Sequence, residues 1–123
     1  MTSFLVVDDS KILRQHAADL IQVLGFTDIR QAINGQDALD QVTDKMPDVI
    51  TLDWNMPVMD GLSFVKALRK LPNGNDVKVI FCTSEGRHAR IQQAFDAGAD
   101  EYIVKPLELA ALRERLLLLE VIV

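Results

Sequence analysis

The sequence predicts an α/β fold in which five parallel strands form one sheet with helices on both faces. Short apolar runs bounded by polar residues have the length and composition of strands buried on both sides. Segments with the period of an amphipathic helix follow these runs, so strands and helices alternate along the chain. Because consecutive parallel strands are joined by right-handed crossovers, this alternation predicts a doubly wound sheet.

Each element can be placed from its pattern. The strands are expected at Phe4–Val7, Ile29–Ala32, Val49–Leu52, Val77–Phe81 and Tyr102–Val104. The five helices are marked by apolar residues at helical spacing: Leu13, Ala17, Leu20, Ile21 and Leu24; Ala38 and Val42; Phe64, Val65 and Leu68; Ile91, Ala94 and Phe95; and Leu109, Leu112, Leu116 and Leu119. Asp60 is placed to cap the third helix, and Gly25 and Gly98 to end the first and fourth.

The composition fits one globular domain over residues 1–123, with no output domain. Hydrophobic residues make up 49% of the chain and charged residues 25%, which is typical of an ordered domain. A net charge of −5 argues against a nucleic-acid partner. Cys82 is the only cysteine, and no apolar stretch is long enough for a signal peptide or a membrane span. We therefore expect a cytoplasmic protein.

Polar side chains with related chemistry follow four of the predicted strands. They are Asp8 and Asp9 after the first strand, Asp53 after the third, Thr83 and Ser84 after the fourth, and Lys105 after the fifth. Each alone could cap a helix or lie at a solvated strand end. In a parallel sheet, however, these ends meet at the edge where ligands bind.

The combination indicates phosphoryl transfer. Three neighbouring carboxylates repel one another, and one lysine offsets only part of their charge. Mg²⁺ favours such oxygens and keeps ligand positions for water and phosphate. Asp53 stands alone at its strand end and is the expected nucleophile, with Asp8 and Asp9 left to hold the metal. Lys105 and the Thr83 hydroxyl would neutralise and bind the phosphoryl oxygens.

These residues lie in segments that resemble the response-regulator receiver domain. The segments are Phe4–Ser10, Asp53–Pro57, Met59–Gly61, Thr83 and Lys105–Pro106. The resemblance covers essentially the whole chain and is closest to the stand-alone chemotaxis regulators of the CheY type. It implies a flavodoxin-like sheet with strand order 2-1-3-4-5.

The resemblance also implies a role for each site residue. Asp53 matches the phosphoacceptor, Asp9 a direct metal ligand, and Asp8 an acid that acts through metal-bound water. Asn55 matches the position whose backbone carbonyl binds Mg²⁺. Thr83 matches the switch hydroxyl, Lys105 the lysine that contacts the phosphoryl group, and Tyr102 the aromatic switch residue. Asn55 and Glu85 match the positions that tune phosphoryl lifetime, and the peptide bond before Pro106 is expected to be cis.

The function implied is a phosphorylation-controlled switch in two-component signalling, in chemotaxis. The phosphodonor would be a sensor histidine kinase or histidine phosphotransfer protein, and the output would be contact with another protein, the flagellar motor switch being the leading target. A phosphate sink or relay stays open within this class. A different class, a small Mg²⁺-dependent phosphatase with an aspartyl nucleophile, usually carries a general acid two residues after the nucleophile. Here that residue is Asn55, whose amide cannot give up a proton.

Other residues carry weaker expectations. Cys82 is expected in the core, His16 and His88 on the solvated surface, and Trp54 partly exposed. The surface from Arg87 to Arg90 with Tyr102, Leu107 and the last helix matches the usual signalling face of the family. Its basic and apolar mix fits the docking of a partner and fits a plain solvated helix face equally well. Residues 117–123 are too apolar for one buried stripe on a helix. We therefore expect these residues either to contact another molecule or to be poorly ordered, and we expect the protein to be a monomer or a weak homodimer.

Overall fold

The predicted sheet is present in the computed structural model, which describes residues 1–122. Its strands run parallel in the order β2-β1-β3-β4-β5, as expected. They are β1 Ser3–Val7, β2 Asp28–Ala32, β3 Val49–Leu52, β4 Lys78–Thr83 and β5 Glu101–Val104. The helices are α1 Lys11–Val23, α2 Gly35–Asp44, α3 Gly61–Arg69, α4 His88–Ala97 and α5 Leu109–Leu118. Among residues 1–122, no helix has the length and apolar character needed to cross a bilayer.

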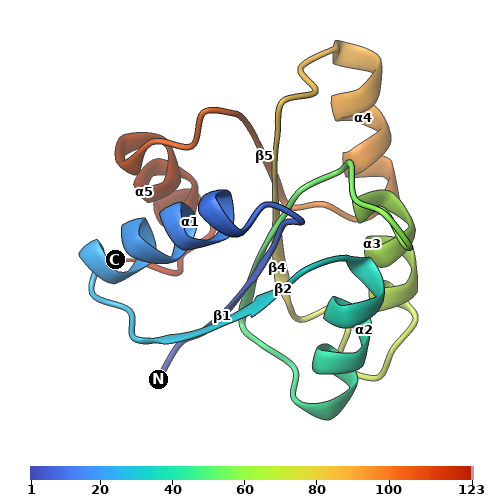
Figure 1. Cartoon of the computed structure of the whole chain (residues 1–123), viewed down its shortest axis with the longest axis horizontal. Helices are drawn as coiled ribbons and strands as arrows, with labels where there is room; N and C mark the ends of the chain where they lie inside the picture. The colour runs from blue at the N-terminus through green and yellow to red at the C-terminus, as the bar shows by residue number, and fades with distance from the viewer. Residues whose placement is uncertain (123) are drawn as a thin grey trace.

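The helices cover the two faces of the sheet unequally. Helices α1 and α5 lie on one face, and α2, α3 and α4 lie on the other (Figure 1). Successive strand residues therefore enter two separate apolar clusters. In β4, Phe81 belongs to the cluster under α2, α3 and α4, whereas Cys82 belongs to the cluster under α1 and α5. The prediction that Cys82 is a core residue is confirmed.

Three helices begin with a side-chain cap. The Ser10, Asn34 and Asp60 side chains accept hydrogen bonds from the backbone N–H groups of Leu13, Asp37 and Ser63, at 3.3, 2.8 and 2.8 Å. These bonds satisfy N–H groups that have no partner inside the helix. The expected cap at Asp60 is thus confirmed. Helix α4 begins after Arg87 without such a bond, so neither Thr83 nor Ser84 caps it.

Two expectations about apolar residues need correction. Trp54 is 4% exposed instead of lying partly in solvent, because it packs against Phe81. The C-terminal residues Leu119, Val121 and Ile122 pack against the cluster under α1 and α5, so this stretch is not a surplus apolar face. Only Leu117 and Leu118, 41% and 64% exposed, fit that expectation, and Val123 lies outside the described residues.

Candidate functional site

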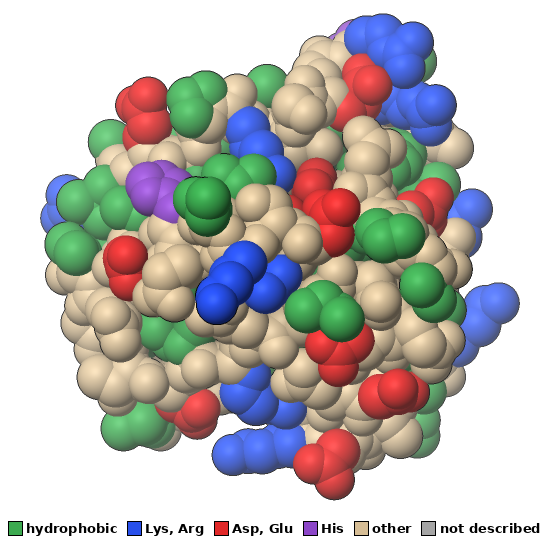
Figure 2. Space-filling view, in the orientation of Figure 1, with side chains coloured by type: hydrophobic (Ala, Val, Ile, Leu, Met, Phe, Trp, Pro, Cys, Tyr) green, Lys and Arg blue, Asp and Glu red, His purple; other side chains and the backbone are tan. Residues whose placement is uncertain are grey.

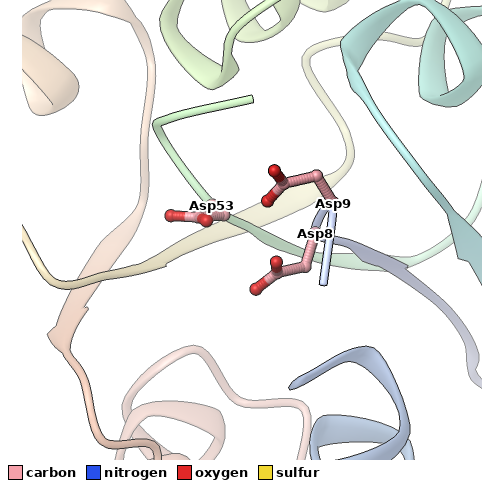
Figure 3. A group of neighbouring side chains, drawn as sticks. All are labelled: Asp8, Asp9 and Asp53. Atoms are coloured by element: carbon pink, nitrogen blue, oxygen red, sulfur yellow. The ribbon is translucent and has the colours of Figure 1, made fainter. Parts of the chain in front are cut away.

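The three predicted acids meet at the carboxyl end of the sheet. Strands β1 and β3 are paired so that Val7 lies beside Leu52, which brings the residues that follow these strands together. Oxygens of the Asp8, Asp9 and Asp53 carboxylates lie within 4.8 Å of one another (Figure 3). Asp8 and Asp53 are buried, whereas Asp9 is exposed. The cluster thus has a buried floor and a side open to solvent.

Lys105 supplies the positive charge at this cluster. Its ammonium donates hydrogen bonds to Asp8 Oδ2 at 2.8 Å and to Asp53 Oδ2 at 3.3 Å. Its backbone N–H donates to the Thr83 carbonyl at 2.8 Å, which fixes the end of β5 beside that of β4. The Lys105–Pro106 peptide bond is cis. One ammonium among three carboxylates leaves an excess of negative charge.

Burial and this excess charge shift the acid–base properties of the pair. Burial raises the pKa of Asp53; the Lys105 charge opposes the shift, and the Asp8 charge adds to it. For Lys105, burial lowers the pKa, but the hydrogen bond to Asp8 and the Asp53 charge outweigh it, so the pKa is raised. Lys105 therefore stays protonated at neutral pH, and a further cation beside Asp53 would favour its ionised form.

The donor set fits Mg²⁺. Carboxylate oxygens with incomplete charge compensation are the ligands this hard cation prefers, and the exposed Asp9 leaves space for water and phosphate oxygens. Asn55 follows in the loop after Asp53 and is exposed there, where its carbonyl is the predicted fourth protein ligand. The residues present can hold the ion that the sequence predicts.

A glycine sets the distance between Asp53 and the start of α3. The Gly61 N–H donates to the Trp54 carbonyl at 2.9 Å and so closes the loop of residues 54–60, which we call the acceptor loop. A Cβ at Gly61 would collide with the carbonyl oxygen of Asp53. Only glycine therefore permits this approach of helix and strand end.

Comparison with known proteins agrees with the fold and the cluster. The family model of the response regulator receiver domain matches residues 4–117. The chain belongs to this family. It is 41% identical over 114 residues to a chemotaxis protein CheY homolog of Campylobacter jejuni, covering 91% of this chain and 87% of that protein.

Solved structures of similar proteins extend the comparison. CheY4 of Vibrio cholerae superposes with a TM-score of 0.88 at 33% identity, covering 99% of both chains. A chain of the CheX–CheY–BeF3–Mg complex of Borrelia burgdorferi superposes with a TM-score of 0.90 at 26% identity, covering 97% of this chain and 89% of that one. This receiver domain is therefore similar to chemotaxis proteins in both sequence and shape.

The remaining predicted residues lie around the receiver cluster. Thr83 is fully buried at the end of β4. The Tyr102 ring is buried, and its hydroxyl donates to the Glu85 backbone carbonyl. The Glu85 carboxylate accepts hydrogen bonds from the Arg87 backbone and from its guanidinium, which lower the pKa of Glu85 to about 2. Tyr102 of β5 thus holds the backbone of Glu85 in the loop before α4.

Sequence reasoning missed three contacts of this receiver domain. Arg14 donates to the Asp8 carbonyl at 2.8 Å, and the Arg90 guanidinium lies over the Trp54 ring. His16, expected on the solvated surface, has its Nε2 2.8 Å from the Leu107 carbonyl, to which it can donate. Each contact joins residues far apart in the chain or aims a side chain at a backbone oxygen, and no sequence motif marks either arrangement.

A cavity of about 390 Å³ lies beside the carboxylates, under α1. Its lining includes the apolar or weakly polar residues Ala17, Cys82 and Leu107 together with the charged residues Asp8, Asp53 and Lys105. Burial raises the pKa of the Cys82 thiol to about 12, so the thiol lines this space in its neutral, unreactive form.

Proposed function

We propose that Asp53 accepts a phosphoryl group from a phosphohistidine and that the domain acts as a signalling switch in chemotaxis. The donor is a sensor histidine kinase or a histidine phosphotransfer protein. One observation carries this proposal: the Asp53 carboxylate is buried at the sheet edge beside Asp8, Asp9 and Lys105. The chemotaxis assignment is supported by the names of the similar proteins.

The transfer needs positioning and charge neutralisation. A carboxylate oxygen of Asp53 forms a bond to phosphorus while the bond from phosphorus to the imidazole nitrogen breaks, and the imidazole leaves with that electron pair. Lys105 offsets the negative charge of the phosphoryl oxygens, and the Thr83 hydroxyl donates to one of them. Asp8, Asp9, Asp53 and the Asn55 carbonyl would hold Mg²⁺, which would supply further positive charge to offset the negative charge of the phosphoryl group.

The phosphorylated state then changes a protein-binding face. The phosphoryl group adds nearly two negative charges at Asp53, which favours movement of Thr83 and Lys105 toward it. Tyr102 responds to the shift of Thr83, and the surface of α4, β5 and α5 binds a downstream protein, with the flagellar motor switch as the proposed target. Asn55 and Glu85 set the rate at which Asp53 loses its phosphoryl group, and the domain catalyses no reaction on other molecules.

The phosphatase alternative has no observation in its favour. Asn55 occupies the position of the general acid and is exposed in the acceptor loop, where its amide cannot donate a proton to a leaving group. A phosphate sink or relay would use the same cluster and differ only in the protein that receives the phosphoryl group or the signal.

Intact mass after incubation with Mg²⁺ and acetyl phosphate tests the proposal. We expect one added phosphoryl group on the native protein and none on Asp53→Asn. Asp96→Asn, an exposed aspartate on α4, is the matched control and should be modified like the native protein. Modification of Asp53→Asn, or a native protein that stays unmodified under these conditions, would contradict the assignment of Asp53.

A further inference from the structure

Trp54, the residue after the acceptor, is buried in contact with two residues from other elements. Its ring packs against Phe81, with ring centres 5.5 Å apart, and the Arg90 guanidinium lies over it at 5.3 Å from the ring centre. Phe81 in turn stacks on Tyr102, with ring centres 5.9 Å apart and planes at 15°. We call Trp54, Phe81 and Tyr102 the aromatic row. Arg90 covers Trp54, the member of this row that follows the acceptor Asp53 in the chain.

The backbone of Trp54 connects this row to the acceptor carboxylate. The Trp54 N–H donates to Asp53 Oδ1 at 2.8 Å, while Asp53 Oδ2 accepts from Lys105 at 3.3 Å. The two carboxylate oxygens are therefore held by different partners. A displacement of Trp54 would release Oδ1 and let the carboxyl group rotate away from the orientation set by Lys105.

The acceptor loop needs restraint from outside itself. Val58 has a φ of 71°, in the left-handed region, where a β-branched side chain is strained, and its side chain is 82% exposed. Because this residue contributes strain and little packing, neighbouring elements must hold the loop. The contacts of Trp54 with Phe81 and with Arg90 can supply that restraint.

The charge of Arg90 is available for this contact. Among residues 1–122, no carboxylate lies within ion-pair distance of its guanidinium, in contrast to Arg87, which pairs with Glu85. Arg90 is half-buried in the first turn of α4, where basic side chains gather at the upper end of the helix in Figure 2. A cation over an indole face is attracted to it most strongly where water is partly excluded.

We propose that Arg90 is a positioning residue for phosphoryl acceptance. By covering the Trp54 ring it keeps the Trp54 N–H on Asp53 Oδ1, and it thereby links the start of α4 to the acceptor. This role rests on the proposed function of Asp53. It differs from the roles of Thr83 and Lys105 because Arg90 acts through Trp54 and needs no contact with the phosphoryl group.

Trp54 is the only tryptophan of the chain, so its fluorescence tests the proposal directly. The variants are Arg90→Ala, Arg90→Lys and, as a charge-matched control, Lys66→Ala, which changes an exposed residue of α3 outside the proposed binding face. Acrylamide quenching is measured first, without Mg²⁺. Fluorescence titration with beryllofluoride and Mg²⁺ then gives the half-saturating concentration, and thermal unfolding checks that every variant is folded.

We expect Arg90→Ala to increase quenching and to raise the half-saturating beryllofluoride concentration about two- to fivefold, the range a partly exposed cation–π contact supports. Arg90→Lys should recover most of both effects because it keeps a cation, and Lys66→Ala should match the native protein. Unchanged quenching and titration in folded Arg90→Ala would overturn the inference and leave the proposed function intact. A native protein that binds no beryllofluoride would overturn both, whereas increased quenching in Arg90→Ala with an unchanged titration would overturn the positioning role alone.

Discussion

The two faces of the sheet are packed differently on either side of Asp53. Under α2, α3 and α4 the space is filled by large rings, among them the fully buried Phe64 and Phe81 and the rest of the aromatic row. Under α1, a cavity of about 390 Å³ remains, and its lining includes the small side chains of Ala17 and Cys82 beside the larger ones of Leu13 and Leu107. Since close-packed interiors transmit displacements and voids absorb them, the filled face suits communication with α4. The cavity face leaves space for Lys105 to move.

The largest expected effect on stability tests this difference in packing at two adjacent residues of β4. Phe81 and Cys82 point to opposite faces, and 0% and 6% of their surfaces are exposed. Phe81→Ala should lower the free energy of unfolding by about 3–5 kcal/mol, because it removes a large ring from a filled cluster. Cys82→Ala should lower it by about 1 kcal/mol or less, since it removes one sulfur beside an existing cavity. Urea unfolding at equilibrium measures both, and equal losses would show that the faces are packed alike.

Much of this contrast could not be predicted from the sequence. The apolar runs and helical spacing were sufficient for all five strands, all five helices and the acid cluster, because a parallel sheet brings its strand ends together by geometry. The burial of Trp54 depends on Phe81 and Arg90, which follow it by 27 and 36 positions in the sequence. The cavity depends on how side chains of α1 meet those of β4 and residues 105–107. Neither arrangement leaves a periodic pattern.

The charge cluster gives the next prediction. Lys105→Ala removes the partner of Asp8 and Asp53, and losing one member of a buried ion pair costs about 3–5 kcal/mol. The Lys105 side chain is 17% exposed and borders the cavity, so water can reach the carboxylates, and we expect a loss of about 2 kcal/mol. Mg²⁺ at millimolar concentration should recover most of it. Unfolding measured with and without Mg²⁺ checks this, and a loss that Mg²⁺ leaves unchanged would contradict the metal site.

Two alanines in helices on opposite faces sharpen the comparison further. Ala17 lines the cavity, whereas Ala38 is fully buried in the filled cluster. Ala→Val costs both helices a similar amount of propensity, roughly 0.5 kcal/mol, so this contribution cancels. Ala38→Val should destabilise the protein by about 1–3 kcal/mol through overpacking, and Ala17→Val should cost at least 1 kcal/mol less because its methyl groups enter empty space. Thermal unfolding of the two variants measures these losses of stability, and equal losses would mean that the cavity cannot accept side-chain atoms.

The smallest effect is expected at Asp53 itself, which borders both faces. Burial raises its pKa above the value of 3.8 for an unperturbed aspartate, so the folded protein holds the proton more tightly than the unfolded chain. The ionised carboxylate therefore costs stability once the pH rises through the folded-state pKa, and this cost is absent below pH 3.8. Asp53→Asn, which resembles the protonated form, should raise the unfolding temperature by a few degrees at pH 7 and match the native protein at the acid end. Mg²⁺ should reduce or reverse the gain by stabilising only the native carboxylate. A gain that persists below pH 3.8 would instead assign the effect to the packing of the amide, and the cluster would then lack the unbalanced charge on which its metal binding depends.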